Sequence, residues 1–215
     1  MTYLEMVNDV LARLRETSVS TVNQTPYSTL IGKFVNDSKR QIEDAYKWNV
    51  LATSITLTTS ASTYQYSLTG AGQKFQVIDA INITSNVGLT NITFVDMNRK
   101  QNFTPIVNSI PTQFSFNGVD SSGDTKVTLY PRPGGVYSLL FSVIVPQAVL
   151  ALDGTSVLVP DSLVVQNAYA RALVERGEDG GLNSSEAYQL YKSMLSDQIA
   201  LEGTRYPEEG QFVPT

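Results

Sequence analysis

The sequence predicts an α+β protein in which helix pairs from both ends of the chain form a four-helix bundle, with an antiparallel β domain inserted between the two pairs. Apolar residues recur at helical spacing in two segments near the start and in two near the end. Between them, short segments alternate apolar and hydroxyl side chains with a period of two, which is typical of half-buried strands. Each helical pair alone is too small to hide its apolar side, so we expect all four helices to share one core.

The first two helices are predicted within residues 1–50. Thr2 and Glu5 have the spacing of a capping box, and apolar residues follow at helical spacing: Leu4, Val7, Val10, Leu11 and Leu14. The second helix is expected from Tyr27 to about Trp48, with Pro26 at its first turn. Its core side should hold Leu30, Ile31, Phe34, Val35, Ile42, Ala45 and Tyr46. Its solvent side should hold Lys33, Asp37, Lys39, Arg40 and Asp44.

Residues 51–159 are expected to form the antiparallel β domain, as a single sheet or a sandwich. Turn residues such as those of Gly123-Asp124 separate the strands. The strands are predicted at 54–58, 64–68, 75–83, 91–95, 113–117, 126–130 and 137–145. No helix is expected between them, which argues against a parallel doubly wound sheet.

The third and fourth helices are predicted within residues 160–203. The third begins at Pro160-Asp161, with Asp161 as its cap, and ends at Gly177; its core side holds Val164, Val165, Ala168, Ala172 and Leu173. The fourth is capped by Asn183 with Glu186 and carries Ala187, Leu190, Tyr191, Met194, Leu195 and Ile199. The bundle therefore comprises 1–50 with 160–203. Residues 204–215 have no apolar period and are expected to form an extended C-terminal tail.

Composition excludes several classes of function. The chain has no histidine and no cysteine, so it cannot carry Ser-His-Asp or Cys-His catalysis, zinc ligation by these residues, or a disulfide. Fifteen basic and twenty acidic residues give a net charge of -5 without any basic cluster, which disfavours tight binding to nucleic-acid phosphates. No apolar run is long enough to cross a bilayer, and the first residues lack signal-peptide features. We expect no catalytic residue, metal, cofactor or membrane partner, and synthesis in a cytoplasm.

The remaining candidates for chemistry each have a simpler structural explanation. Gly70-Ala-Gly72-Gln-Lys74 lacks the full phosphate-loop pattern and is better explained as a turn. Asp120 and Asp124 could offer oxygens to calcium, but a hairpin turn is favoured. Two further groups are better assigned to surface or packing: the acids Glu175, Glu178 and Asp179, and the tyrosines Tyr64, Tyr66, Tyr188 and Tyr191, which could also be interpreted as a glycan platform.

Several short signatures, taken in order, resemble a known family. The second helix ends in Arg40-Gln-Ile-Glu-Asp-Ala-Tyr-Lys-Trp48-Asn49 before the strands begin, and Leu129-Tyr-Pro-Arg-Pro-Gly134 leads into a later strand. Val159-Pro-Asp161 then opens a helix containing Ala168-Tyr-Ala-Arg-Ala-Leu-Val-Glu-Arg-Gly177. This succession resembles the head-to-tail adaptors of short-tailed bacteriophages, the family that includes tail tubular protein A. The resemblance spans nearly the whole chain.

The resemblance implies a structural virion protein without catalytic residues. Subunits of such adaptors form a homo-oligomeric ring, about twelve copies, between the portal protein and the tail nozzle. DNA passes through the lumen without specific binding, tail fibres are a further candidate partner, and assembly takes place in the host cytoplasm before the protein resides in the virion neck. The extended tail implies portal contact, for which Tyr206, Phe212 and Val213 are the candidates.

Two interpretations from other classes stay open at this stage. The β domain could serve a receptor-binding or carbohydrate-binding tail protein, in which case trimers rather than rings would be expected. A small carboxylate-dependent hydrolase would instead require two acids that converge in a cleft.

Overall fold

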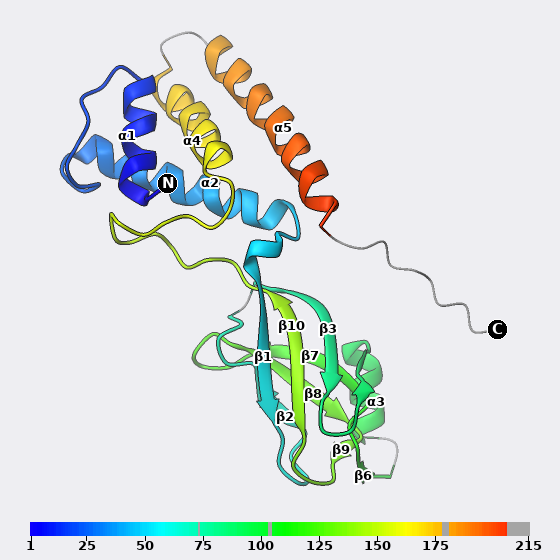
Figure 1. The fold of residues 1–215 in the computed structure, drawn as a ribbon. Helices are drawn as coiled ribbons and strands as arrows, with labels where there is room; N and C mark the ends of the chain where they lie inside the picture. The colour runs from blue at the N-terminus through cyan, green and yellow to red at the C-terminus, as the bar shows by residue number, and fades with distance from the viewer. Residues whose placement is uncertain (73, 103–104, 178–180, 206–215) are drawn as a thin grey trace. The chain divides into compact units, whose positions relative to one another are not determined.

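The structure is a computed structural model that describes residues 1–72, 74–102, 105–177 and 181–205 (Figure 1). Contacts divide the chain into two compact units. The helical unit combines Met1–Leu51 with the chain from Pro146 onward, and the β unit comprises Ala52–Val145. Helices therefore flank a strand-rich middle, which confirms the predicted α+β class.

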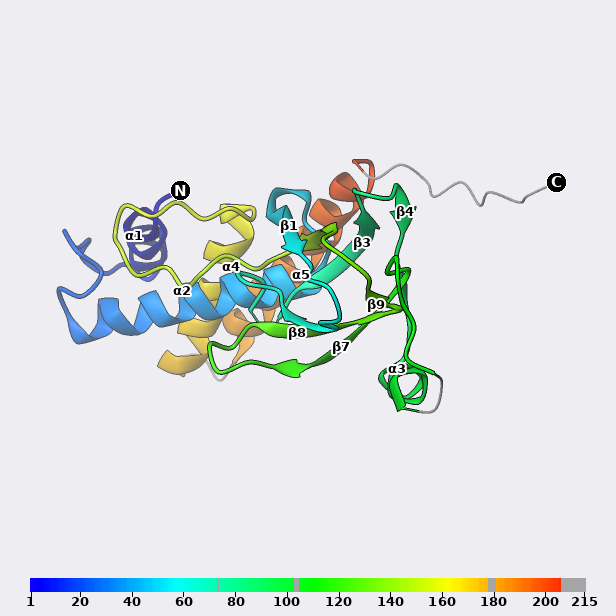
Figure 2. The ribbon, with the colours of Figure 1, turned by 90° about the horizontal axis from the view of Figure 1, so that it is seen from below.

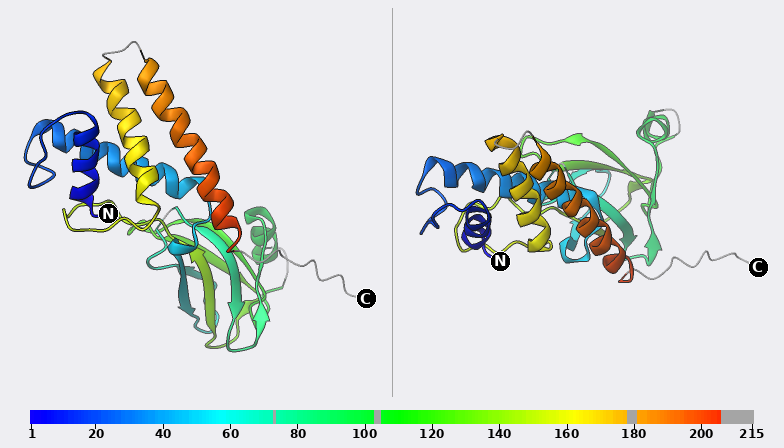
Figure 3. Two further views of the ribbon diagram at one scale, coloured as in Figure 1. Left: turned by 45° about the horizontal axis from the view of Figure 1, so that its top comes forward. Right: turned by 90° about the horizontal axis from the view of Figure 1, so that it is seen from above.

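The helical unit is organised around the helix α4. It contains α1 (Tyr3–Arg13), α2 (Pro26–Ala45), α4 (Asp161–Arg176) and α5 (Leu182–Gly203). α4 packs against each of the other three, and both Figure 1 and Figure 3 show it between α1 and α5. The central position explains why α4 is buried over much of its surface: Leu163, Val164, Val165, Ala168, Ala170 and Ala172 are all buried, and so are the polar Gln166 and Asn167.

The predicted ends of α1, α2 and α4 rest on capping chemistry that the structure confirms. The Thr2 hydroxyl accepts from the Glu5 amide while the Glu5 carboxylate accepts from the Thr2 amide, which completes the capping box. α2 begins with Pro26 behind the N-cap Thr25. α4 ends at Gly177, whose φ of 63° is the left-handed conformation that glycine adopts without strain.

Two of the predicted caps are wrong. Asp161 is the first helical residue of α4 rather than its cap, and its carboxylate accepts a hydrogen bond from the amino group of Met1 at 2.8 Å. The cap of α5 is Gly181 rather than Asn183, because the left-handed φ of 95° at Gly181 turns the chain into the helix. Asn183 lies within the first turn of α5.

The end of α2 also differs from the prediction. The helix stops at Ala45, and a 3-10 turn, η1 (Asn49–Leu51), follows. The stop is favoured because the buried Trp48 folds back and donates its indole N–H to the Ile42 carbonyl at 2.7 Å. Lys39, expected on the solvent side of α2, is only 2% exposed.

The described residues of the β unit form two four-stranded sheets and one two-stranded pair. The first sheet has the order β1 (Ala52–Thr58), β10 (Ser138–Ile144), β3 (Gln76–Asn82) and β4 (Val87–Gly88), and all of its pairs are antiparallel. The second has the order β2 (Gln65–Ser67), β8 (Thr125–Tyr130), β7 (Gln113–Val119) and β5 (Thr90–Asn91). The pair consists of β6 (Asn108–Ser109) and β9 (Arg132–Pro133).

The two larger sheets share one apolar core. Register aligns Ile55, Phe141 and Ala80 in one row of the first sheet, so these side chains share one face. The ring of Phe141 meets Phe114 of β7 edge-on, with centroids 5.4 Å apart. The core also takes in Leu57, Leu68, Leu139, Val127, Leu129 and Val143. The β unit is therefore a sandwich, one of the two predicted forms.

One predicted strand is wrong, because residues 94–102 form the helix α3 (Phe94–Asn102), seen end-on in Figure 2. Thr93 starts this helix: its hydroxyl accepts from the Asp96 amide at 3.1 Å and donates to the Asp96 carboxylate at 2.7 Å. α3 packs on β7 and β8 through the buried Met97. The short pairs β5–β7 and β6–β9 are parallel, so the β unit is mainly rather than wholly antiparallel.

Residues 146–160, here named the connecting segment, lead from β10 back to α4. The sequence placed the end of the β domain at 159, whereas the β unit ends at Val145. The segment lies with the helices because the amides of Tyr3 and Leu4 donate to the carbonyls of Thr155 and Asp153, at 2.9 and 3.0 Å. These bonds satisfy donors at the start of α1 that have no partner within the helix.

Candidate assembly surfaces

The turns that suggested phosphate or calcium binding use their polar groups internally. The Asp124 carboxylate accepts hydrogen bonds from the amides of Gly70 and Gly72, at 3.1 and 3.0 Å. Asp120 accepts from the amides of Ser122 and Asp124 at 2.8 and 3.0 Å. A hydrogen bond from the Ser67 side chain, together with these backbone bonds, holds the pKa of Asp120 below its ordinary value. Both segments are therefore built as turns, as the sequence favoured.

The tyrosines that could have formed a glycan platform have structural contacts, and Tyr188 and Tyr191 pack against each other with ring centroids 5.8 Å apart. Glu175 is exposed on α4, while Glu178 and Asp179 lie outside the described residues. Tyr66 donates its hydroxyl to the Thr63 carbonyl at 2.8 Å, and Tyr64 lies beneath the Arg132 guanidinium. Among the described residues, no group of three or more acids is arranged to hold a metal ion, and no helix is long and apolar enough to cross a membrane.

A buried ion pair fastens the connecting segment to α2. Lys39 and Glu43 lie one turn apart, with Nζ 3.1 Å from the carboxylate and side chains 3% and 0% exposed. The same ammonium donates to the carbonyls of Gln147 and Ala148 at 2.7 and 3.1 Å, and Glu43 accepts from the Gln147 amide at 3.2 Å. Burial raises the pKa of Glu43, and the charge of Lys39 opposes that shift.

Further hydrogen bonds fix the shape of the connecting segment. Asn36 of α2 exchanges two bonds with the backbone of Leu150, at 2.8 and 3.1 Å. The Gln147 side chain donates to the Ser156 carbonyl at 2.8 Å and accepts from the Leu158 amide at 3.2 Å, which ties the two arms of the segment together. The segment is thus held in one conformation by α1, α2 and its own contacts.

Large apolar side chains nevertheless project from this fixed segment. Val149 is 74% exposed and Leu152 is 73% exposed, and Leu158 is also exposed. We name these three residues the segment patch. A hollow of about 440 Å³ adjoins Val149, and its lining includes Lys33 and Asp37 of α2. A large apolar side chain that a fixed backbone holds in water does not stabilise the monomer. The segment patch is therefore a candidate contact surface.

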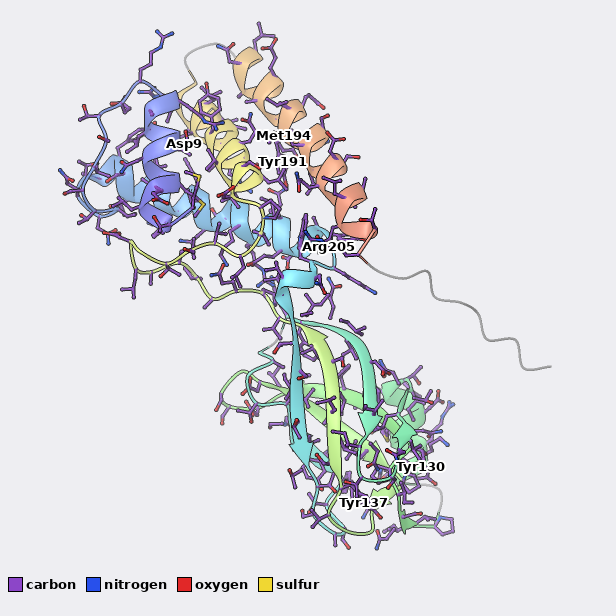
Figure 4. All side chains as sticks on the ribbon, viewed as in Figure 1. Asp9, Tyr130, Tyr137, Tyr191, Met194 and Arg205 are labelled. Carbon is purple, nitrogen blue, oxygen red and sulfur yellow. The ribbon has the colours of Figure 1, made fainter. Side chains whose placement is uncertain are left out.

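Helix α5 has one side against α4 and another that no described residue covers. Ala187 and Tyr191 are buried on the inner side, where Figure 4 shows Tyr191 toward α4, and burial raises the pKa of the Tyr191 hydroxyl. Leu182, Leu190 and Leu201 are 68%, 53% and 62% exposed. Their spacings of eight and eleven residues place them within one sector of roughly 100°. We name these three leucines the α5 outer stripe.

A groove of mixed polar and apolar lining lies on another part of the helical unit. It encloses about 250 Å³ and is lined by residues of α2, α4 and α5, with the exposed Val174 and Tyr188 at its rim. Inside it, the Gln41 amide oxygen accepts from both Asn167 and Arg171 at 2.9 Å. These bonds join α2 to α4, so the groove has a structural explanation.

The β unit has its own exposed apolar groups, concentrated around α3 and the segment that follows it. Phe94, Val95, Ile106, Val107 and Ile110 are all exposed. On the first sheet, β3 and the residue after it expose Ile78, Ile81 and Ile83. Both regions add apolar surface to a chain in which few charges are available.

The predicted portal-binding residues Tyr206, Phe212 and Val213 lie outside the described residues. The segment patch was missed because its three apolar residues have no regular period. Leu190 of the α5 outer stripe was recognised as apolar but assigned to the bundle core. Its helical spacing could not separate a core side from a partner-facing side.

Rigid apolar surfaces on a fold without an assembled reaction centre in its described part are typical of a structural protein that functions by association. Residues 1–211 match the family described as SU10 adaptor protein, and the chain therefore belongs to this family. The match confirms the predicted head-to-tail adaptor of a bacteriophage, a structural protein that associates with portal and tail components in the virion neck. No curated protein matches the chain.

Proposed function

We propose that this adaptor forms a ring of about twelve subunits between the portal and the tail nozzle, and that DNA passes through the ring during ejection. The observation that carries the proposal is the apolar surface that the helical unit leaves uncovered, at the α5 outer stripe and the segment patch. Lateral contacts between neighbouring subunits require such surfaces. Electron microscopy of the chain mixed with portal protein tests the ring directly.

The charge of the chain supports passage of DNA through the lumen. The net charge is -5, and no cluster of Lys or Arg occurs in the sequence. Phosphates bind proteins mainly through such basic clusters, with release of counterions. A neutral or acidic lumen would therefore let DNA slide without being held.

The C-terminal tail is proposed to contact the portal. Tyr206, Phe212 and Val213 are large apolar residues within a polar, proline-containing sequence. A short segment of this composition can dock on a partner by strand addition or by filling pockets. Tail fibres, proposed as a further partner, have no residue assigned to them.

Deleting residues 206–215 is expected to weaken binding to the portal while leaving the thermal unfolding midpoint nearly unchanged. α5 already ends before this segment, and the contact between Arg205 and Glu202 at its end is retained. Co-sedimentation with portal protein measures the binding. A matched variant with Y206S, F212S and V213S keeps the tail length and should show the same loss.

Equal portal binding by the truncated, substituted and unaltered chains would contradict the proposed tail contact. A large fall in the thermal midpoint on truncation would also contradict it, because the tail would then belong to the subunit core.

A further inference from the structure

The helical unit exposes two different apolar surfaces, the α5 outer stripe and the segment patch. The α5 outer stripe lies on the helix that packs on one side of α4, and α1 packs on the other side, as Figures 1 and 3 show. The segment patch lies beside α1 and α2, because the connecting segment bonds to the start of α1 and to Lys39 and Asn36 of α2. The two surfaces are thus formed by different elements of the unit.

Two distinct surfaces suit a head-to-tail contact between identical chains. A two-fold dimer uses one self-complementary surface twice and would leave the other exposed. A head-to-tail contact places one surface of each copy against the other surface of the next, which covers both and continues around a closed ring.

Charges beside the two surfaces are complementary. Glu186 and Asp197 lie on the sector of α5 that carries the outer stripe, and neither forms an ion pair with another described residue. Lys33 lines the hollow beside Val149 and likewise has no ion-pair partner among the described residues. Asp37 shares that hollow, so the expected attraction is local to Lys33.

We propose that the α5 outer stripe of one copy docks on the segment patch of the next copy of the same chain, with the acids of α5 near Lys33. The assignment rests on the proposed ring and identifies its lateral contact. Leu190 and Leu201 fill the apolar part of the interface against Val149 and Leu152. Both surfaces are fixed before contact, α5 by its packing on α4 and the connecting segment by Lys39 and Asn36, so little ordering is needed on association.

Cysteine cross-linking tests the pairing, because the natural chain has no cysteine. Full-length chains carrying L190C with V149C, and each substitution alone, are mixed with portal protein and treated with a short bis-maleimide. The L190C/V149C chain is expected to give a ladder of multimers, since every subunit then links to two neighbours. Each single variant should give almost none, and an equal mixture of the two single variants should stop at dimers.

The control replaces Leu190 by an exposed residue away from both surfaces. V174C with V149C presents a thiol at least as accessible as that of L190C, because Val174 is 68% exposed on α4 and Leu190 is 53% exposed. Its cross-linked yield should be several-fold lower than that of L190C with V149C. Dimers from L190C alone would overturn the proposal in favour of a two-fold α5 contact. Equal yields from the control would also overturn it.

Sedimentation before cross-linking distinguishes failure of the proposed ring from failure of the proposed lateral contact. If no adaptor co-sediments with the portal, the proposed ring is wrong. If adaptor assembles on the portal but L190C with V149C gives no ladder, the ring stands and this lateral contact is wrong. A charge exchange gives a second check: K33E and D197K should each reduce assembly, and the double variant should recover it.

Discussion

We expect the Lys39→Met variant to lose about 3–5 kcal/mol of unfolding free energy, measured by urea unfolding of the full chain followed at the helical circular dichroism signal. The substitution leaves the Glu43 carboxylate, 0% exposed, without its counter-charge. It also removes the donor from the carbonyls of Gln147 and Ala148. The ion pair therefore stabilises both α2 and the attachment of the connecting segment.

The same helix provides a matched control. Arg40 and Asp44 form an ion pair with the same i to i+4 spacing at 3.0 Å, but their side chains are 33% and 49% exposed. Replacing Arg40 by methionine should cost less than about 1 kcal/mol. The double variant K39M/E43L should recover most of the loss, because no buried charge is left unpaired. Equal losses for K39M and R40M would show that burial of the pair has been overestimated.

The loss in K39M should depend on pH in a defined direction. Burial raises the pKa of Glu43, and removing Lys39 takes away a charge that lowers it. A carboxyl group whose pKa is raised in the folded state stabilises the fold fully when the pH is below its unfolded-state pKa. This stabilisation is lost as the pH rises through the folded-state pKa. The difference between K39M and the unaltered chain should therefore shrink as the pH falls toward the unfolded pKa of glutamate.

Phe141→Ala is expected to cost about 3–5 kcal/mol of unfolding free energy. The ring is fully buried at the centre of the sandwich and makes the edge contact with Phe114. Its removal loses the transfer free energy of an aromatic side chain and leaves a cavity between two sheets whose strands are fixed by register. Urea unfolding at a tryptophan-independent signal, such as far-ultraviolet circular dichroism, measures the loss.

Phe94→Ala is the matched control, because that ring lies on α3 and is 48% exposed. Its cost should be below about 1 kcal/mol, since surface substitutions away from special features are usually small. Similar costs at the two positions would contradict the assignment of Phe141 to the core and of Phe94 to the surface.

The fold was predictable where local chemistry decides it. The period of α1, the capping box at Thr2 and Glu5, and the glycine end of α4 all act over a few residues. Lys39 was assigned to the solvent side because charged residues are usually exposed. Its buried partner, the carbonyl of Gln147, lies 108 residues further along the chain, so no local pattern could indicate the contact. The strand expected at 91–95 failed because five alternating residues also fit a short helix started by Thr93.

The assembly surfaces were only partly predictable for a related reason. Leu190 and Tyr191 are both apolar and follow one helical pattern, yet Tyr191 is buried and Leu190 is exposed. The difference arises from which side of α5 meets α4, a long-range contact. Val149 and Leu152 have no period at all, and only the hydrogen bonds of the connecting segment reveal that they are held outward in a fixed backbone.

Electron microscopy of the full chain mixed with portal protein is the most direct measurement of the proposed assembly. End-on views should show a closed ring of about twelve adaptor subunits attached to the portal, with neighbouring copies in head-to-tail lateral contact. Free trimers that leave the portal bare would contradict the ring and favour the receptor-binding interpretation.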